Sequence, residues 1–513
     1  MKESIMSTLT RRDFLKVGGT AAAVSLSPFD TNKVDSSEGK KPNILLLMTD
    51  QHRANCIGCA GNKIINTPNL DKLAREGFYF PNAYSSTPTC TPARSALLTG
   101  LSPWHHGMLG YGRVANRYPI ELPRAIRDAG YSTIGIGKMH WSLQRNLHGF
   151  HQTILDESSR VETQGFESDY RKWFGEHAPT GLAYDCTGIG WNDYRTRVYV
   201  PPENLHPTFW TAQVAIDFIE KYNDSTPFFI KVSFARPHSP YDPPQRFRDA
   251  YREDDMPVPF VGNWAEKYAP ANPEDYSLWH GNLGIGQARR SHRGYYGSIS
   301  FIDEQIGRIL NSLEKRGFLD NTLILFTADH GDMLGDHNLW RKSYAYESSA
   351  RIPFIVRPPK GMFTNQNQVL DQVVELRDVL PTFLDAAGQS IPDSLDGKSV
   401  LDIVRRKAEN WREFIDMEHD ICYHPSNHWN ALTDGHYKYI YHAQNGEEQL
   451  FDLKNDPGEL NDLTQEPQYR NKVREWRDRL IEHFKERGEP FVVDGDLKPR
   501  PEGMLYSPNY PKM

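Results

Sequence analysis

The 513-residue sequence has few cysteines, little net charge and no long apolar run. Its cysteines are odd in number and irregular in spacing, which excludes a disulfide framework: Cys56, Cys59, Cys90, Cys186 and Cys422. The CxxC pair at 56–59 has no second pair to complete a zinc or redox site, so buried free thiols are the simpler interpretation. A net charge of −7 gives no general attraction to nucleic acid. No segment is long and apolar enough to anchor the chain in a membrane.

The first 27 residues have the pattern of an export signal. Thr10-Arg11-Arg12-Asp13-Phe14-Leu15-Lys16 precedes an apolar run, 17–26, that is too short to span a bilayer. This matches a twin-arginine signal peptide, although an accidental arginine pair before a helix would look the same. We therefore expect the twin-arginine translocase as a partner and a periplasmic or secreted protein. Residues 28–40 are polar and are expected to form a disordered linker.

Apolar runs and helical patterns alternate between residues 41 and 409. Strands are predicted at 42–50, 131–137, 227–234, 322–327 and 352–356, and helices at 68–77, 122–130 and 295–316. This order is typical of an α/β sheet covered by helices on both faces. From 410 to 513 we expect a smaller α+β subdomain, with strands at 437–441 and 448–452 around an Asn-Gly turn and a helix at 470–487.

Two oxygen-rich pairs follow two of the predicted strands. Asp50-Gln51 and Asp329-His330 occupy matching positions, so their side chains are expected to meet where ligands gather in such sheets. Each pair alone is more often a solvated turn or a helix cap than a metal site. Together they predict a divalent-metal site, with oxygen ligands that suit calcium or magnesium and a histidine that leaves manganese or zinc open.

Five basic side chains are further candidates for the site, and three of them, at 138, 140 and 238, closely follow predicted strand ends. The five are Arg94, Lys138, His140, His238 and Lys342. Singly, each is more often a surface charge or a structural histidine. As a set they suit a tetrahedral anion whose leaving oxygen must be protonated.

The stretch CTPARSALLTG at 90–100 resembles the signature of the sulfatase family, in which Cys-x-Pro-x-Arg directs oxidation of the cysteine to formylglycine. Further family segments follow in the family's order: 43–53, GIGKMHW at 135–141, PHSP at 237–240, TADHGDMLGDHNLWRK at 327–342 and LFDLKNDPGELNDL at 450–463. The resemblance implies an alkaline-phosphatase-like α/β fold, with a central mixed sheet flanked by helices and a smaller C-terminal α+β subdomain. It also implies sulfate-ester hydrolysis with one calcium ion.

The resemblance implies a role for each candidate residue. Asp50, Gln51, Asp329, His330 and the modified residue 90 hold the metal. The hydrated aldehyde at 90 attacks sulfur, His238 and Lys342 bind the sulfate and protonate the leaving oxygen, and His140 takes a proton from the second hydroxyl to release sulfate. Arg94 and Lys138 orient residue 90. A formylglycine-generating maturation enzyme is an implied partner, acting before export.

Two departures bear on the function. Many sulfatases have a second aspartate where this chain has Gln51, and Asp-His at 329–330 is less common than Asp-Asn. Both variants resemble the branch that contains iduronate and choline sulfatases, and also the phosphonate monoester hydrolases. The metal affinity and the ester class are therefore open at this point.

The main prediction is an exported sulfatase that acts on a sulfated carbohydrate. His105, His106 and His428 are the predicted substrate-binding residues, because basic and aromatic side chains pair with and stack on sulfated rings. One alternative is a phosphonate monoester or phosphodiester hydrolase with the same nucleophile and metal. Another is a catalytically silent protein that binds sulfated glycans, which would need a broken site, whereas every expected residue is present.

Overall fold

The computed structural model describes residues 41–158, 160–406 and 411–511. The predicted signal peptide (1–27) and linker (28–40) lie outside these residues. Within the described ranges no helix combines the length and the apolar character needed to cross a membrane. All five cysteines are free thiols.

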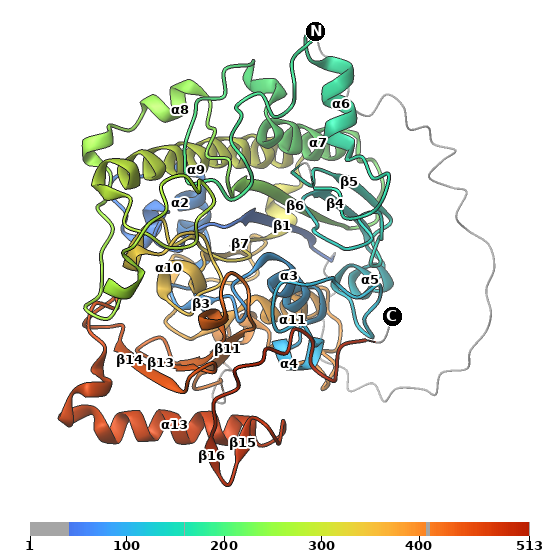
Figure 1. Ribbon diagram of the computed structural model, residues 1–513. Helices are drawn as coiled ribbons and strands as arrows, with labels where there is room; N and C mark the ends of the chain where they lie inside the picture. The colour runs from blue at the N-terminus through green and yellow to red at the C-terminus, as the bar shows by residue number, and fades with distance from the viewer. Residues whose placement is uncertain (1–40, 159, 407–410, 512–513) are drawn as a thin grey trace.

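An eight-stranded mixed sheet forms the centre of the protein (Figure 1), in the order β5-β4-β6-β1-β7-β8-β2-β9. The strands are β1 (Asn43–Asp50), β2 (Phe78–Tyr79), β4 (Ser132–Gly137), β5 (Gln152–Leu155), β6 (Phe228–Pro237), β7 (Thr322–Ala328), β8 (Phe354–Arg357) and β9 (Gln368–Val369). Strands β5, β4, β6, β1 and β7 run parallel, whereas β8 is antiparallel to both its neighbours. The three central strands β6, β1 and β7 are buried along their whole length, as expected when both faces are covered.

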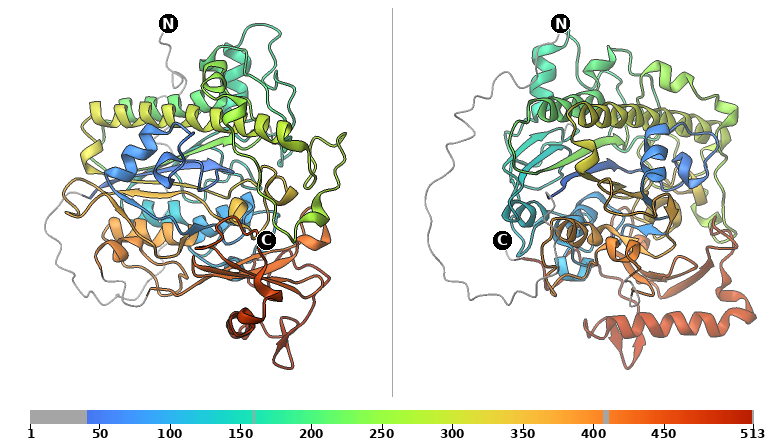
Figure 2. Two further views of the ribbon diagram at one scale, coloured as in Figure 1. Left: turned by 90° about the vertical axis from the view of Figure 1, so that its left-hand side faces the viewer. Right: turned by 180° about the vertical axis from the view of Figure 1, so that it is seen from behind.

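Helices cover both faces of this sheet (Figures 1 and 2). One face carries α2 (Pro68–Arg75), α7 (Pro207–Lys221) and the long α9 (Gly284–Lys315), and the other carries α3 (Cys90–Thr99), α5 (Leu122–Asp128), α11 (Val379–Ala386) and α12 (Val400–Val404). Short helices α4 (Pro103–His106), α6 (Asp169–His177), α8 (Gln245–Asp249) and α10 (Glu347–Ala350) lie in the connections.

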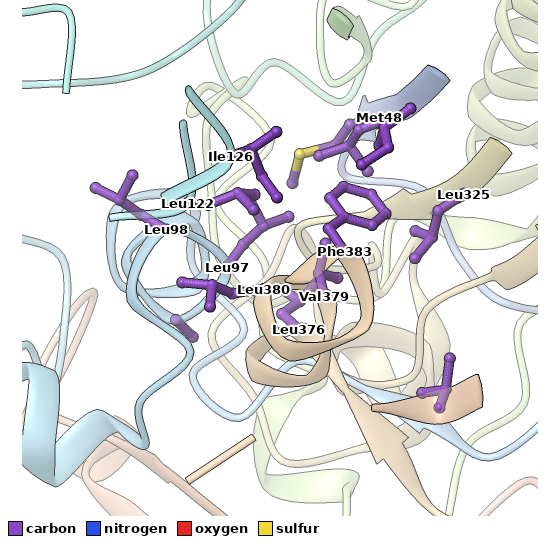
Figure 3. Close-up of a cluster of buried hydrophobic side chains, with 14 of the residues drawn as sticks. Met48, Leu97, Leu98, Leu122, Ile126, Leu325, Leu376, Val379, Leu380 and Phe383 are labelled. Carbon is purple, nitrogen blue, oxygen red and sulfur yellow. The ribbon is translucent and has the colours of Figure 1, made fainter. Parts of the chain in front are cut away.

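Alternation along β1 explains the two separate cores. Leu45 and Leu47 join the cluster with α2, α7 and α9, whereas Leu46 and Met48 join the cluster with α3, α5 and α11. Successive side chains of a strand point to opposite faces, so one continuous apolar run serves both cores. Figure 3 shows the second cluster, in which Met48 lies near Phe383 of α11 and Ile126 of α5.

The C-terminal region forms a second, antiparallel sheet in the order β11-β12-β13-β14. Its strands are β11 (Ile415–His419), β12 (Trp429–Thr433), β13 (Tyr437–His442) and β14 (Glu447–Asp452), with α13 (Arg470–Phe484) packed beside them and the hairpin β15 (Val492–Val493) and β16 (Asp496–Leu497) beyond. A short pair, β3 (Ala83–Tyr84) and β10 (Val374–Glu375), lies near the border with the main sheet.

The predicted fold class is confirmed, including the mixed central sheet and the C-terminal sheet with its helix. One predicted boundary differs by more than three residues. The helix predicted at 295–316 begins 11 residues earlier, at Gly284, because its first turns are rich in glycine and arginine and show little apolar periodicity.

Candidate active site

Cys90 is the first residue of α3 and is buried, with 1% of its surface exposed. Pro92 falls in the first turn, where a missing N–H costs the helix nothing, and Gly100 ends the helix in the left-handed conformation. This geometry places the Cys90 sulfur 3.2 Å from Nε2 of His330 and 3.8 Å from Oδ1 of Asp50. A helix N-terminus stabilises a thiolate or another anion at this point.

Four candidate metal ligands converge beside this helix. Asp50 ends β1 and Asp329 directly follows its parallel neighbour β7, so the two carboxylates meet at one edge of the sheet. His330 has Nδ1 2.9 Å from the carbonyl of Gly331, which makes Nδ1 the donor and leaves Nε2 facing Cys90. Ligand atoms of Asp50, Cys90, Asp329 and His330 all lie within 4.8 Å of one another, and all four residues are buried. This donor set fits a divalent cation.

Gln51 has a left-handed backbone with φ 64° and lies between two charged groups. Its Oε1 accepts a hydrogen bond from the Lys342 ammonium at 2.8 Å, and its Nε2 donates to Asp332 at 2.5 Å. The predicted ligand role of Gln51 stays a prediction, since its amide oxygen faces an ammonium that competes for the same lone pairs.

Arg94 holds the two carboxylates in place. Its side chain is fully buried and lies 3.1 Å from Oδ2 of Asp50 and 2.9 Å from Oδ2 of Asp329, while Nη1 donates to the carbonyl of Lys138 at 2.6 Å. Lys138 also pairs with Asp50. Burial acts to raise the pKa of Asp50, but the charges of Lys138 and Arg94 prevail and hold that pKa well below its usual range.

The electrostatics of Cys90 follow the same pattern. Burial and the charge of Asp50 act to raise the pKa of the Cys90 thiol. Lys342, Lys138 and His330 act in the opposite direction and prevail, so this pKa lies below its ordinary value. Position 90 therefore lies in surroundings that favour negative charge.

Lys342 and His238 form a close pair, with Nζ 2.5 Å from Nε2. Burial and the Lys342 charge hold the pKa of His238 well below its usual value, so the imidazole is neutral. Its Nδ1 lies 2.9 Å from the carbonyl of Ser239 and donates to it, which leaves Nε2 as an acceptor for the Lys342 ammonium. The proton that this pair can deliver to a bound group is therefore carried by Lys342.

His140 is held by two neighbours outside the predicted set. Its backbone N–H donates to Glu157 at 3.0 Å, and its Nδ1 lies 3.1 Å from Nη1 of Arg160. Because arginine only donates, Nδ1 is the acceptor, and the neutral ring carries its proton on Nε2. Burial first, then Arg160 and Lys138, hold the pKa of His140 well below its usual value. In this tautomer His140 presents a donor, and it accepts a proton at Nε2 only after a change of tautomer.

Sequence analysis missed Trp191, Glu157 and Arg160. The Trp191 ring stacks on His238 at 4.0 Å between centroids and lies 4.6 Å from the ammonium of Lys138. Arg160 also contacts Tyr111, which is 44% exposed and whose ring centre lies 6.0 Å from that of His140. These residues lie in connecting loops without apolar periodicity or a motif, so no local signal marks them.

The predicted substrate-binding histidines are dispersed. His105 pairs with Asp396 at 2.8 Å and Glu486 at 3.3 Å, and its hydrogen bond to Asp396 helps raise its pKa to about 9. His106 is buried, which lowers its pKa to about 3. Within the described residues neither makes a hydrogen bond or ion pair with the Cys90 cluster. His428 lines a separate cavity beside the C-terminal tail. A substrate role for all three stays a prediction.

Known proteins resemble this chain over most of its length. Residues 42–389 match the sulfatase family, and residues 335–486 match the C-terminal region of N-sulphoglucosamine sulphohydrolase. An arylsulfatase of Clostridium perfringens is 41% identical over 469 residues, covering 89% of this chain and 97% of the relative. An N-acetylglucosamine-6-O-sulfatase of Bacteroides thetaiotaomicron is 27% identical, covering 88% of this chain and 87% of its own.

Solved structures of other proteins share this fold. The crystal structure of a phosphonate monoester hydrolase of Agrobacterium radiobacter superposes with a TM-score of 0.75 at 23% identity, covering 90% of this chain and 99% of that chain. At this identity the likeness shows the alkaline-phosphatase-like fold alone. The family match and the C. perfringens relative carry the classification: the chain belongs to the sulfatase family and is a sulfuric ester hydrolase.

Proposed function

We propose that this sulfatase removes sulfate from a sulfated carbohydrate, with Cys90 converted to formylglycine and one calcium ion bound beside it. The observation that carries the proposal is the convergence of Cys90, Asp50, Asp329 and His330, whose candidate ligand atoms lie within 4.8 Å of one another. We assign catalysis to residues 41–409 and a smaller subdomain to residues 410–513.

The chain provides ligands for the calcium ion and a cysteine from which formylglycine can form. Asp50, Asp329, His330 and residue 90 would hold the ion, with Gln51 as a further candidate ligand, and the carboxylate oxygens favour a hard cation such as Ca²⁺. A bound ion supplies Lewis acidity and stabilises negative charge on an oxygen nucleophile. Formylglycine supplies, as its hydrate, one hydroxyl for attack and a second that opens a route for sulfate release.

The side chains around position 90 supply orientation and protons. Arg94 and Lys138 fix the carboxylates, which pre-organises the charge of the site. We assign sulfate binding and protonation of the leaving oxygen to Lys342 and His238, and the hydrogen bond between them supports this assignment. We assign the proton transfer that accompanies sulfate release to His140.

The substrate class and the location rest on separate support. The relative named N-acetylglucosamine-6-O-sulfatase supports a sulfated sugar as the substrate. The Arg11-Arg12 motif supports export by the twin-arginine translocase to the periplasm or beyond. Since that route carries folded proteins, the maturation enzyme would oxidise Cys90 in the cytoplasm, before folding and export.

The first test is the mass of the peptide that spans residue 90, taken from protein produced together with a formylglycine-generating enzyme. We expect the mass of the aldehyde, which is lower than that of the cysteine peptide. Turnover of sulfate esters by protein that retains only the unmodified thiol would overturn the proposed nucleophile.

The second test compares substrates. We expect kcat/KM for an aryl sulfate to exceed that for the matching aryl phosphate and phosphonate monoester at least tenfold, and a sulfated saccharide to be hydrolysed as well. Preference for the phosphonate ester would favour the alternative hydrolase of the same superfamily. Turnover of the aryl sulfate but of no sulfated saccharide would contradict the carbohydrate assignment.

A further inference from the structure

A cavity of about 200 Å³ lies beside Trp191, near the carboxyl ends of β5 and β6. The Trp191 ring lines the cavity and also stacks on His238 at 4.0 Å between centroids. His238 itself does not line the cavity, and neither does Cys90. The indole ring therefore forms a wall between this cavity and the site of sulfate hydrolysis.

Asp156, directly after β5, lines the cavity and is a carboxylate without an ion pair in the described part of the chain. It is buried, with 2% of its surface exposed. Its Oδ1 accepts a hydrogen bond from the backbone N–H of Ser158 at 3.1 Å. Its Oδ2 has no hydrogen-bond partner among the described residues, yet it is not one of the fully enclosed atoms. Oδ2 is therefore the atom that a ligand in the cavity can reach.

The cations nearest to Asp156 are already paired with other carboxylates. Arg236 forms its ion pair with Asp242, and Lys138 forms its ion pair with Asp50. Burial prevails over both cations and raises the pKa of Asp156. A buried carboxylate without a counter-ion is costly, so a cationic ligand at Oδ2 would relieve that cost.

The other charged groups of the wall favour a cation that also carries an oxygen. Asp185 is exposed and makes no ion pair within the described residues, so it adds negative charge to the cavity. Arg236 donates through Nε and Nη2 to the two oxygens of Asp242 at 2.8 and 3.1 Å. Its Nη1 has no partner among the described residues and is not fully enclosed, so it remains a donor for a ligand oxygen.

The aromatic part of the wall suits an organic cation. Tyr170, Tyr184 and Trp191 line the cavity, and the faces of such rings attract ammonium groups. A metal ion does not fit, because within the described residues three or more metal-ligating atoms converge at Cys90 alone. An ammonium that bears hydrogens can donate to Oδ2 of Asp156, whereas a quaternary ammonium cannot.

We propose that this cavity binds a small organic compound with a primary ammonium group and a neighbouring oxygen, separately from the sulfate ester. The ammonium would donate to Oδ2 of Asp156, and the oxygen would accept from Nη1 of Arg236. The aromatic rings would contact the carbon atoms between these two groups. The inference goes beyond the proposed function, since it concerns a second ligand that the sulfate ester does not displace.

The test is a ligand-observed NMR titration with three probes: 2-aminoethanol, ethylene glycol, which has a hydroxyl in place of the ammonium, and tetramethylammonium, which has no N–H. We expect the protein to bind 2-aminoethanol at least tenfold more tightly than either other probe. Asp156→Asn keeps an acceptor for Ser158 but removes the charge, and it should weaken that binding at least tenfold. Asp224→Asn is the matched control, because Asp224 also accepts from a backbone N–H two residues later, at 2.9 Å, but does not line the cavity.

Several results would overturn the proposal. They are no binding of 2-aminoethanol, binding that Asp156→Asn leaves unchanged, and equally tight binding of tetramethylammonium. If Asp156→Asn does not fold, as judged by circular dichroism, Asp185→Asn at an exposed position provides the comparison, with an expected loss of about threefold.

Aryl-sulfate kinetics test whether the two ligands bind separately. We expect saturating 2-aminoethanol to change KM for the aryl sulfate by less than about twofold, since the wall formed by Trp191 separates the two positions. A KM that rises in proportion to the 2-aminoethanol concentration would place the compound in the sulfate-ester site and contradict the proposal. The NMR titration requires no turnover, so its result does not depend on the proposed function.

Discussion

Two of the buried charge clusters in the described part of the chain have different designs. Around Cys90, the cations Arg94, Lys138 and Lys342 surround carboxylates and an imidazole whose free atoms converge. At the border of the C-terminal sheet, Lys438 on β13 lies 2.7 Å from Glu347 and 2.9 Å from Glu459. Both clusters contain pKa values shifted by burial and by opposite charge.

The two clusters differ in which groups neutralise their buried charges. In the Lys438 cluster, groups of the protein pair with the buried charges. The ammonium contacts both carboxylates, and the backbone N–H of Glu347 donates to Glu459 at 2.8 Å. In the Cys90 cluster Arg94 contacts Oδ2 of both carboxylates, but their Oδ1 atoms still converge with an imidazole nitrogen and a sulfur. A shifted pKa is thus common to structural and catalytic clusters, and converging ligand atoms distinguish the second.

The comparison predicts a loss of chemistry at one cluster and a loss of stability at the other. Cys90→Ala removes the atom from which the nucleophile is made, so we expect kcat for an aryl sulfate to fall by about 10⁴-fold or more, with little change in the thermal midpoint. Cys56→Ala, which removes another buried thiol, should retain kcat within about twofold. Comparable losses in the two variants would contradict the role of Cys90.

Lys438→Met should produce the opposite pattern. Removing the ammonium leaves Glu347 and Glu459 buried beside each other, and breaking a buried pair in this way costs about 3–5 kcal/mol. We expect a lower urea midpoint, with aryl-sulfate kcat retained in the folded fraction. Adding Glu347→Gln and Glu459→Gln to this variant should restore part of the stability, and a midpoint that the single change leaves unaltered would show that the pair is not needed for folding.

Lys231 on β6 sharpens the comparison, because it is a buried lysine that makes no ion pair with a carboxylate among the described residues. It is 3% exposed, and burial first, then Arg94, lowers its pKa to about 7. Its charge is therefore disfavoured in the folded state, whereas Glu347 and Glu459 raise the pKa of Lys438 despite burial. We expect Lys231→Met to stabilise the protein by about 2 kcal/mol at neutral pH, the opposite sign to Lys438→Met.

The pH dependence provides the check on Lys231. Below pH 7 the lysine is protonated in both states and its burial cost is fully present. Between pH 7 and the ordinary pKa of lysine only the unfolded chain binds the proton, so this residue makes stability rise with pH. Urea midpoints measured across that range should lose this part of the slope in Lys231→Met. An unchanged slope, or a destabilised variant, would show that Lys231 is not a buried, disfavoured charge.

Much of the fold and of the Cys90 cluster was predictable, because continuous apolar runs mark buried parallel strands. Asp50 and Asp329 follow such runs, and neighbouring strands bring their ends together. The histidines expected to bind substrate show the limit of this reasoning. His105 finds Asp396 and Glu486, which lie 291 and 381 residues away, and no local pattern predicts such partners. The contact of Arg160 with His140 has the same origin in loop packing.

Arg160 gives the smallest expected effect and the finest test of the Cys90 cluster. It donates to Nδ1 of His140, contacts Tyr111 and Glu162, and is 12% exposed. In Arg160→Met no guanidinium would fix the tautomer and orientation of His140. We therefore expect kcat for an aryl sulfate to fall about tenfold, which corresponds to an activation barrier higher by about 1.4 kcal/mol. Loss of the nearby cation should also raise the pKa of His140, since Arg160 helps to hold that pKa down.

The pH profile separates this positioning role from a general loss of structure. The acid limb of kcat should move to higher pH in Arg160→Met, because His140 then binds a proton more readily. Arg160→Lys keeps the charge and should shift the limb little while still losing part of kcat, since an ammonium does not reproduce the geometry of the guanidinium. Arg145→Met, at an exposed arginine paired with Asp169, should keep both kcat and the profile. A lower kcat with an unmoved acid limb in Arg160→Met would mean that the arginine supports the loop and does not act through His140.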